Sequence, residues 1–231
     1  MRAEWAIPLT IGLVVLSLPI TERGQGAGVP GDALFRFLAL GDSYTIGEKV
    51  NLADRWPVQL AGMLRARKLK VADPEIIART GWTTDELAAG IAVAAPVGPY
   101  ALVTLLIGVN NQYRGCDVER YRGEFVSLLS QAVEFAGGKA GRVVVLSIPD
   151  WGVTPFAVGR DRVRIGADID RFNVVNREET LGVGARYVDV TPASREGHEA
   201  WTTADGLHPS RAQYRRWADL ALESATTALR N

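Results

Sequence analysis

The chain has almost no cysteine and little histidine. Cys116 is the single cysteine among 231 residues, so no disulfide can form within the chain and no cysteine-based metal or redox motif can be built. The two histidines are His198 and His208. His198 and Glu199 begin the zinc-binding pattern H-E-x-x-H, but Thr202 stands where the second histidine belongs, so we predict no metal site.

The chain also lacks an excess of charge of either sign. Lysine plus arginine and aspartate plus glutamate number 26 each, which removes the general electrostatic attraction that nucleic acid would need. We therefore expect no nucleic-acid partner. Hydrophobic residues make up 47% and charged residues 23%, as in ordinary globular proteins, and 231 residues suit one well-buried domain. A monomer is expected.

An apolar run lies close to the N-terminus, from residue 6 to residue 20. It is shorter than the roughly 20 apolar residues that a membrane span needs, but it fits the apolar region of a signal peptide. We therefore predict an exported protein, periplasmic or secreted, with residues 1–30 as leader plus linker and residues 31–231 as the folded domain. An uncleaved N-terminal anchor is the alternative, and it would be the only membrane contact.

From Leu34 onward, apolar runs of strand length alternate with segments of helical period, which is typical of β-α-β units around a parallel sheet. The run after Ala101 does not alternate with polar residues, as expected for a strand covered by helices on both faces. Thr83 with Glu86 forms a capping-box pattern that predicts the start of a helix. The expected strands are residues 34–40, 75–78, 101–107, 142–148 and 187–190.

Ser43 follows the first expected strand directly, in the stretch Gly-Asp-Ser-Tyr-Thr. In open parallel sheets ligands bind beyond the carboxyl ends of the strands, so this serine stands where a nucleophile belongs. Its surroundings are not the G-x-S-x-G elbow of α/β-hydrolases, because Thr45 replaces the second glycine. A serine hydroxyl is a weak nucleophile until a neighbouring base takes its proton, so the base is the next requirement.

His208 is the better of the two histidine candidates for that base. It lies three residues after Asp205 in a short loop ahead of the last expected helix. In such a loop the carboxylate can fold onto one imidazole nitrogen while the other nitrogen faces the serine. His198 lacks this arrangement. The sequence therefore predicts a triad of Ser43, His208 and Asp205.

Two residues after other strands can donate hydrogen bonds to the oxyanion of an acyl-transfer reaction. Gly81 follows the second strand just ahead of the capped helix, so its backbone N–H can point into the same cleft. Asn110 follows the third strand and offers its side-chain amide. Taken singly, each has an ordinary structural explanation: Gly81 suits a turn, Asn110 a helix cap and Ser43 a serine turn.

Taken together, four ordered motifs resemble the sequence blocks of the SGNH, or GDSL-type, hydrolase superfamily: Gly41-Asp42-Ser43, Gly81, Gly108-x-Asn110 and Asp205-x-x-His208. The similarity covers the chain from Leu34 to the last helix. The stretch 41–47 with Arg55-Trp56-Pro57 is similar to bacterial lysophospholipase-like and carbohydrate-esterase-like members. The resemblance implies a flavodoxin-like α/β fold, a three-layer α/β/α sandwich with a central, mostly parallel sheet of five strands.

The resemblance also implies the roles of the site residues. Ser43 is expected to be the nucleophile, His208 the general base and Asp205 its partner. The Ser43 amide, the Gly81 amide and the Asn110 side chain are expected to form the oxyanion hole. Asn111 departs from the family, which usually has aspartate at this position. The side chains expected to contact substrate are Asp42, Asn111, Tyr113 and Trp151.

We therefore expect a serine hydrolase that cleaves carboxylic esters of small acyl, lipid or acetylated-carbohydrate type through an acyl-enzyme. Its partner would be a small-molecule ester, and the mechanism needs no metal or organic cofactor. Two alternatives stay open. The same triad could transfer the acyl group to another hydroxyl, and the fold could belong to a catalytically silent binding domain.

Overall fold

The structure, a computed structural model, describes residues 34–196 and 201–230. The expected leader, its boundary with the domain and His198 lie outside the described residues. The described chain contains one sheet of five parallel strands in the order β2-β1-β3-β4-β5. Each expected strand is present, with ends within three residues of the predicted ones. The strands are β1 (Phe37–Gly41), β2 (Glu75–Ala78), β3 (Leu102–Leu106), β4 (Val143–Leu146) and β5 (Arg186–Val188).

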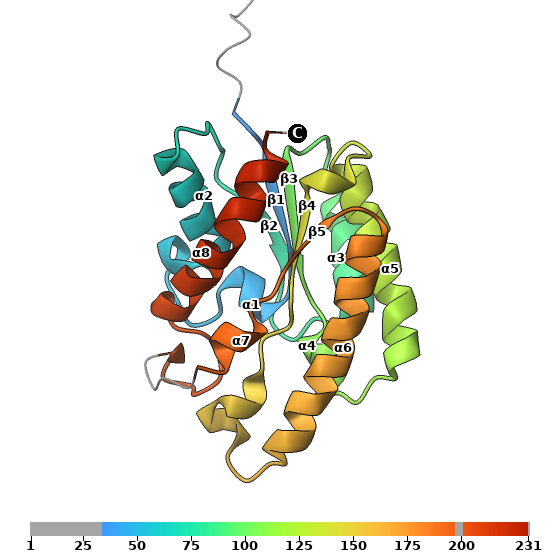
Figure 1. The fold of residues 1–231 in the computed structure, drawn as a ribbon, viewed down its shortest axis with the longest axis vertical. Coiled ribbons are helices and arrows are strands. Elements are labelled where there is room, and N and C mark those ends of the chain that lie inside the picture. Colours follow the sequence, from blue (N-terminus) through green and yellow to red (C-terminus); the bar gives the residue numbers. More distant parts are fainter. Residues whose placement is uncertain (1–33, 197–200, 231) are drawn as a thin grey trace, which may run out of the picture. The chain divides into compact units, whose positions relative to one another are not determined.

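Helices cover both faces of the sheet, which gives the predicted three-layer α/β/α architecture (Figure 1). On one face α2 (Trp56–Ala66) packs against α8 (Arg211–Ala228), and on the other lie α3 (Thr84–Ala94), α5 (Val118–Phe135) and α6 (Arg162–Gly182). Strands β1, β3 and β4 are buried along their whole length. The uninterrupted apolar runs of these strands are explained by this double coverage.

Short helices and turns lie near the ends of the sheet and in the loops. As predicted, α3 begins after Thr83, whose hydroxyl and amide form a capping box with Glu86. The short elements, of three to five residues each, are α1 (Ser43–Ile46), α4 (Val109–Tyr113), α7 (Thr191–Ser194), η1 (Leu52–Asp54), η2 (Ala140–Arg142), η3 (Trp151–Val153) and η4 (Pro155–Ala157).

The last helix, α8, presents one apolar face to the core. Tyr214, Trp217 and Ala221 are fully buried there, as the helical spacing of these residues predicts, while Arg215 and Asp219 lie on the exposed side. Among the described residues, no helix is both long enough and apolar enough to cross a lipid bilayer.

The loops after β2, β1 and β3 lie side by side because these strands are neighbours. Gly41, at the end of β1, is in register with Ala78 of β2 and Leu106 of β3. A side chain at Gly41 would meet the Thr45 hydroxyl at 2.2 Å and the Leu106 carbonyl at 2.3 Å, so only glycine fits where the chain turns from β1 into α1. The three loops therefore leave the sheet at one place, where a parallel sheet binds its ligand.

Candidate active site

Ser43 is the first residue of α1, the single-turn helix that follows β1. Asp42 caps this helix, because its carboxylate accepts a hydrogen bond from the Tyr44 amide at 3.0 Å. Gly47 ends the helix in the left-handed conformation, with φ of 69°, and donates its amide to the Ser43 carbonyl. The turn therefore fixes the backbone of Ser43 from both sides.

The loop between residues 203 and 209 folds the Asp205 carboxylate onto His208. Oδ2 of Asp205 lies 2.7 Å from Nδ1 of His208, and Oδ1 accepts bonds from the Leu207 and His208 amides and from the Thr203 hydroxyl, at 2.9 to 3.0 Å. Burial raises the pKa of Asp205, but these hydrogen bonds, led by that from His208, outweigh it and hold the pKa well below its usual range. The carboxylate is therefore ionised at neutral pH.

One cavity of about 200 Å³ brings four of the predicted residues together. Ser43, Gly81, Asn110 and His208 all line it, although they come from four separate segments of the chain. Asp205 stands behind His208, at the Nδ1 nitrogen of the ring. Residues that carry a hydroxyl, an imidazole and two amide groups thus border one space, and these are the groups that acyl transfer requires.

Gly81 and Asn110 both have surroundings that suit a hydrogen-bond donor. Gly81 has φ of 86°, in the region that favours glycine, and a side chain there would meet only the Arg114 guanidinium, at 3.8 Å. The Asn110 amide nitrogen donates to the Trp82 carbonyl at 2.9 Å. Since an amide nitrogen carries two hydrogens, the second can point into the cavity that Asn110 lines.

Asp42 and Asn111, which were predicted to contact substrate, are not among the residues that line the cavity. Asp42 is fully buried, and this burial raises its pKa to about 7 against the opposing effect of the hydrogen bond from the Tyr44 amide. Asn111 is buried as well. Its oxygen accepts from the Thr84 amide at 3.1 Å, and its nitrogen donates to the Thr84 hydroxyl at 2.7 Å. Both side chains therefore hold helix starts in place.

Comparison with protein families agrees with this geometry. The model of the GDSL-like lipase/acylhydrolase family matches residues 39–216. The chain belongs to this family. The protein is therefore a hydrolase acting on esters, and the resemblance carried by its four motifs is confirmed.

Solved structures show the same fold at low sequence identity. The crystal structure of TesA has a TM-score of 0.64 and 19% identity, over 82% of this chain and 97% of that chain. A lipase/acylhydrolase from Enterococcus faecalis has a TM-score of 0.63 and 19% identity, over 84% of this chain and 96% of that chain. A mutant of Axe2, an acetyl-xylooligosaccharide esterase from a Geobacillus species, has a TM-score of 0.65 and 18% identity, over 82% of this chain and 93% of that chain. No curated protein matches the chain significantly in sequence.

The aromatic residues that line the cavity of this GDSL-type esterase include Tyr44, Tyr113, Trp151 and Phe156. The rings of Tyr113, Trp151 and Phe156 lie against one another, and we call these three the aromatic wall. Tyr113 and Trp151 were predicted to contact substrate, and both side chains border the space. The centroids of these two rings are 5.4 Å apart, and that of Phe156 lies 6.0 Å from that of Trp151. The Trp151 indole nitrogen donates to Gln112 at 2.8 Å, which fixes the ring.

Sequence analysis missed several residues of the site, among them Arg160 and Thr80. The Arg160 guanidinium lies 4.9 to 5.5 Å from the centroids of all three rings of the aromatic wall, in cation–π geometry. An arginine in an irregular, exposed stretch carries no signal that could have indicated this contact. Thr80 lines the cavity too. Its place one residue before Gly81 could have pointed to it.

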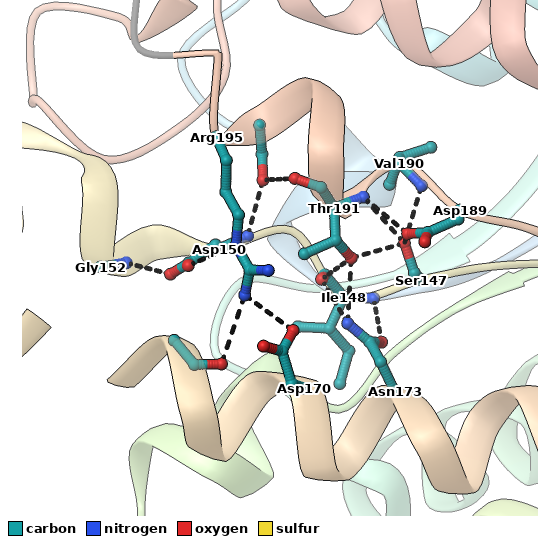
Figure 2. A network of polar contacts seen from close by, with 12 residues as sticks. Ser147, Ile148, Asp150, Gly152, Asp170, Asn173, Asp189, Val190, Thr191 and Arg195 are labelled. Atoms are coloured by element: carbon teal, nitrogen blue, oxygen red, sulfur yellow. Dashed lines mark hydrogen bonds and ion pairs between the residues drawn. The ribbon is translucent and has the colours of Figure 1, made fainter. Parts of the chain in front are cut away.

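An ionic network holds the loop that carries Trp151 (Figure 2). The buried Asp150 carboxylate accepts from Nε of Arg195 at 2.9 Å and from the Gly152 amide at 2.8 Å. Arg195 also reaches Asp170 of α6, at 2.7 Å. The Asp150 carboxylate therefore stabilises its own loop. The Arg195 side chain connects that loop to α6 and to the segment after β5.

Further bonds tie the same loop to other parts of the esterase (Figure 2). Asn173 of α6 accepts from the Ile148 amide at 2.7 Å and donates to the Ile148 carbonyl at 2.9 Å. The Thr191 hydroxyl, beyond β5, also donates to the Ile148 carbonyl at 2.9 Å. At the other end, the Phe156 amide donates to the Gly206 carbonyl at 3.0 Å, which connects the aromatic wall to the loop of His208.

Proposed function

We propose that the protein is a serine esterase that works through an acyl-enzyme. Ser43 is the nucleophile, His208 the general base and Asp205 the carboxylate that orients the imidazole. The observation that carries the proposal is the shared cavity: Ser43 and His208 line one space, and Asp205 lies 2.7 Å from the Nδ1 nitrogen of the ring. Membership of a family of ester hydrolases supports it.

In the first step, His208 takes the proton of the Ser43 hydroxyl as the oxygen attacks the ester carbonyl carbon. The ionised Asp205 stabilises the imidazolium that forms. The amides of Ser43 and Gly81 and the side chain of Asn110 donate to the tetrahedral oxyanion. Collapse of this intermediate releases the alcohol, which receives its proton from His208. Water then attacks the acyl-enzyme with the same base, and the acid leaves.

The aromatic wall gives the cavity one apolar side, which supports an ester with an apolar or ring-shaped part next to the scissile bond. Acyl chains and sugar rings both pack on aromatic faces. We propose carboxylic esters of small acyl, lipid or acetylated-carbohydrate type as substrates. A panel of acetyl, butyryl, long-chain, lysophospholipid and acetylated xylo-oligosaccharide esters, ranked by kcat/KM, would place the esterase among these classes.

Replacement of the nucleophile tests the proposal. Ser43→Ala should reduce turnover of p-nitrophenyl acetate by several orders of magnitude and abolish labelling by a fluorophosphonate probe, because both reactions need the hydroxyl. Ser130→Ala, on the exposed side of α5, is the matched control and should react like the wild type. Equal turnover and labelling in wild type and Ser43→Ala would refute the assignment.

A further inference from the structure

The loop between β2 and α3 is held by two side chains of the α4 segment. The Asn110 amide nitrogen donates to the Trp82 carbonyl at 2.9 Å, and Nη2 of Arg114 donates to the Gly81 carbonyl at 2.6 Å. Asn110 and Arg114 are four residues apart around one helical turn, so they lie on the same face. Two successive carbonyls of the loop are therefore bound by one face of α4.

Arg114 is itself anchored at the start of α3. Its guanidinium pairs with Glu86 at 3.3 Å, and the Glu86 carboxylate accepts from the Thr83 amide at 2.9 Å. The arginine thus links the Gly81 carbonyl to the capping box that begins α3. The side chain of Arg114 is 49% exposed and that of Glu86 41%, so small solutes in the solvent can reach this contact.

The backbone of Gly81 depends more on such a hydrogen bond from a side chain than the backbone of a residue with a side chain of its own does. Its φ of 86° is one of many backbone conformations open to glycine, and without a side chain it has no packing to select one of them. The direction of its N–H matters for the proposed reaction, because a donor stabilises the oxyanion only when it is aimed where the charge develops.

We infer that Arg114 is a positioning residue for the oxyanion hole: its hydrogen bond to the Gly81 carbonyl keeps the Gly81 N–H aimed into the cavity. This inference rests on the proposed function and deepens it. Arg114 does not line the cavity, so it acts through the backbone of Gly81 and not through contact with substrate. The Glu86 carboxylate in turn keeps the guanidinium in place.

Steady-state kinetics of Arg114→Ala tests the inference. We expect kcat for p-nitrophenyl acetate to fall about 10- to 100-fold, as for a small displacement of a reacting group, with KM nearly unchanged. The rate of phosphonylation by the fluorophosphonate probe should fall in parallel, since that reaction also develops charge on an oxygen in the hole. The pH at half-maximal activity should stay the same, because the pair of Asp205 and His208 is untouched.

Chemical rescue separates positioning from a merely structural role. Guanidinium ion, at concentrations far below those that unfold proteins, should restore part of the kcat lost in Arg114→Ala, because it can fill the vacated site between Gly81 and Glu86. Arg114→Lys should retain an intermediate kcat. Arg215→Ala, which breaks an exposed ion pair on α8 with Asp219, is the matched control and should be unaffected and insensitive to guanidinium.

Three results would overturn the inference. They are an unchanged kcat in Arg114→Ala, a raised KM with unchanged kcat, and a lowered kcat that guanidinium does not restore. If Arg114→Ala does not fold, Glu86→Gln and Arg114→Lys decide instead, and wild-type kcat in both would count against it. None of these results touches the proposed nucleophile, whose failure would show in Ser43→Ala alone.

Discussion

The two sides of the cavity are held by contacts of very different span along the chain. On the side of the triad, Asp205 bonds to His208 only three residues away. On the side of the aromatic wall, Trp151 bonds to Gln112 across 39 residues, and Asp150 bonds to Arg195 across 45. A contact within a loop forms with that loop, whereas a distant contact requires the whole sheet to be in order.

This difference predicts that substitutions on the two sides have different effects. Loss of the short-span contact between Asp205 and His208 should affect turnover, because in the proposed mechanism these groups carry charge or protons. Loss of a long-span contact of the aromatic wall or of its loop should affect stability or the fit of the substrate, because the groups concerned hold the wall. Three substitutions, from the largest expected effect to the smallest, test whether the two sides can be separated in this way.

Asp205→Asn tests the short-span side. Asparagine keeps the size of the side chain but removes the charge that stabilises the imidazolium, so kcat/KM for p-nitrophenyl acetate should fall about 10³- to 10⁴-fold. Asp219→Asn, on the exposed side of α8, is the matched control and should keep wild-type turnover. Near-normal turnover of Asp205→Asn would remove this carboxylate from the triad.

Arg195→Ala tests the long-span side through stability. It leaves the buried Asp150 carboxylate without its ionic partner, so the free energy of unfolding, measured in urea, should fall by about 2 to 3 kcal/mol. Turnover of a small ester should fall far less than in Asp205→Asn. Arg215→Ala, which breaks an exposed pair, should lower stability by less than about 1 kcal/mol. Equal losses in the two variants would mean that the network does not hold the loop.

Arg160→Ala tests the wall alone and has the smallest expected effect. An exposed cation–π contact is worth about 0.5 to 1 kcal/mol, so KM for an ester with a bulky apolar group should rise about 2- to 5-fold while kcat stays the same. The KM for p-nitrophenyl acetate should not change. Arg164→Ala, at a highly exposed position of α6, serves as control. A fall in kcat would show that the wall also governs the chemistry.

Short sequence patterns predicted the strands and part of the candidate site. The strands lie where apolar runs of strand length stand, because helices on both faces leave no polar side. Ser43 was predicted as the nucleophile from its place directly after the first run, and it lines the cavity. Asp205 and His208 were found from their spacing, because a three-residue separation in a tight loop brings a carboxylate to an imidazole.

The remainder of the site depends on which strands are neighbours, and a single sequence does not state that. The contact of Arg160 with the aromatic wall arises because the loop after β4 lies beside α4 once the sheet has formed. Asp42 and Asn111 were assigned to substrate because polar residues after strands often face a ligand. Helices begin at the same places and need capping groups, and both side chains are used in that way.

The bond from the Phe156 amide to the Gly206 carbonyl has a bearing on redesign of the esterase. It joins the aromatic wall to the loop that carries His208, the proposed base. We therefore expect that reshaping the wall to admit a larger ester also shifts the imidazole, so that a change in selectivity comes with slower turnover. Libraries that vary residues 153–158 together with residues 203–207 have the best prospect of altering selectivity without losing turnover.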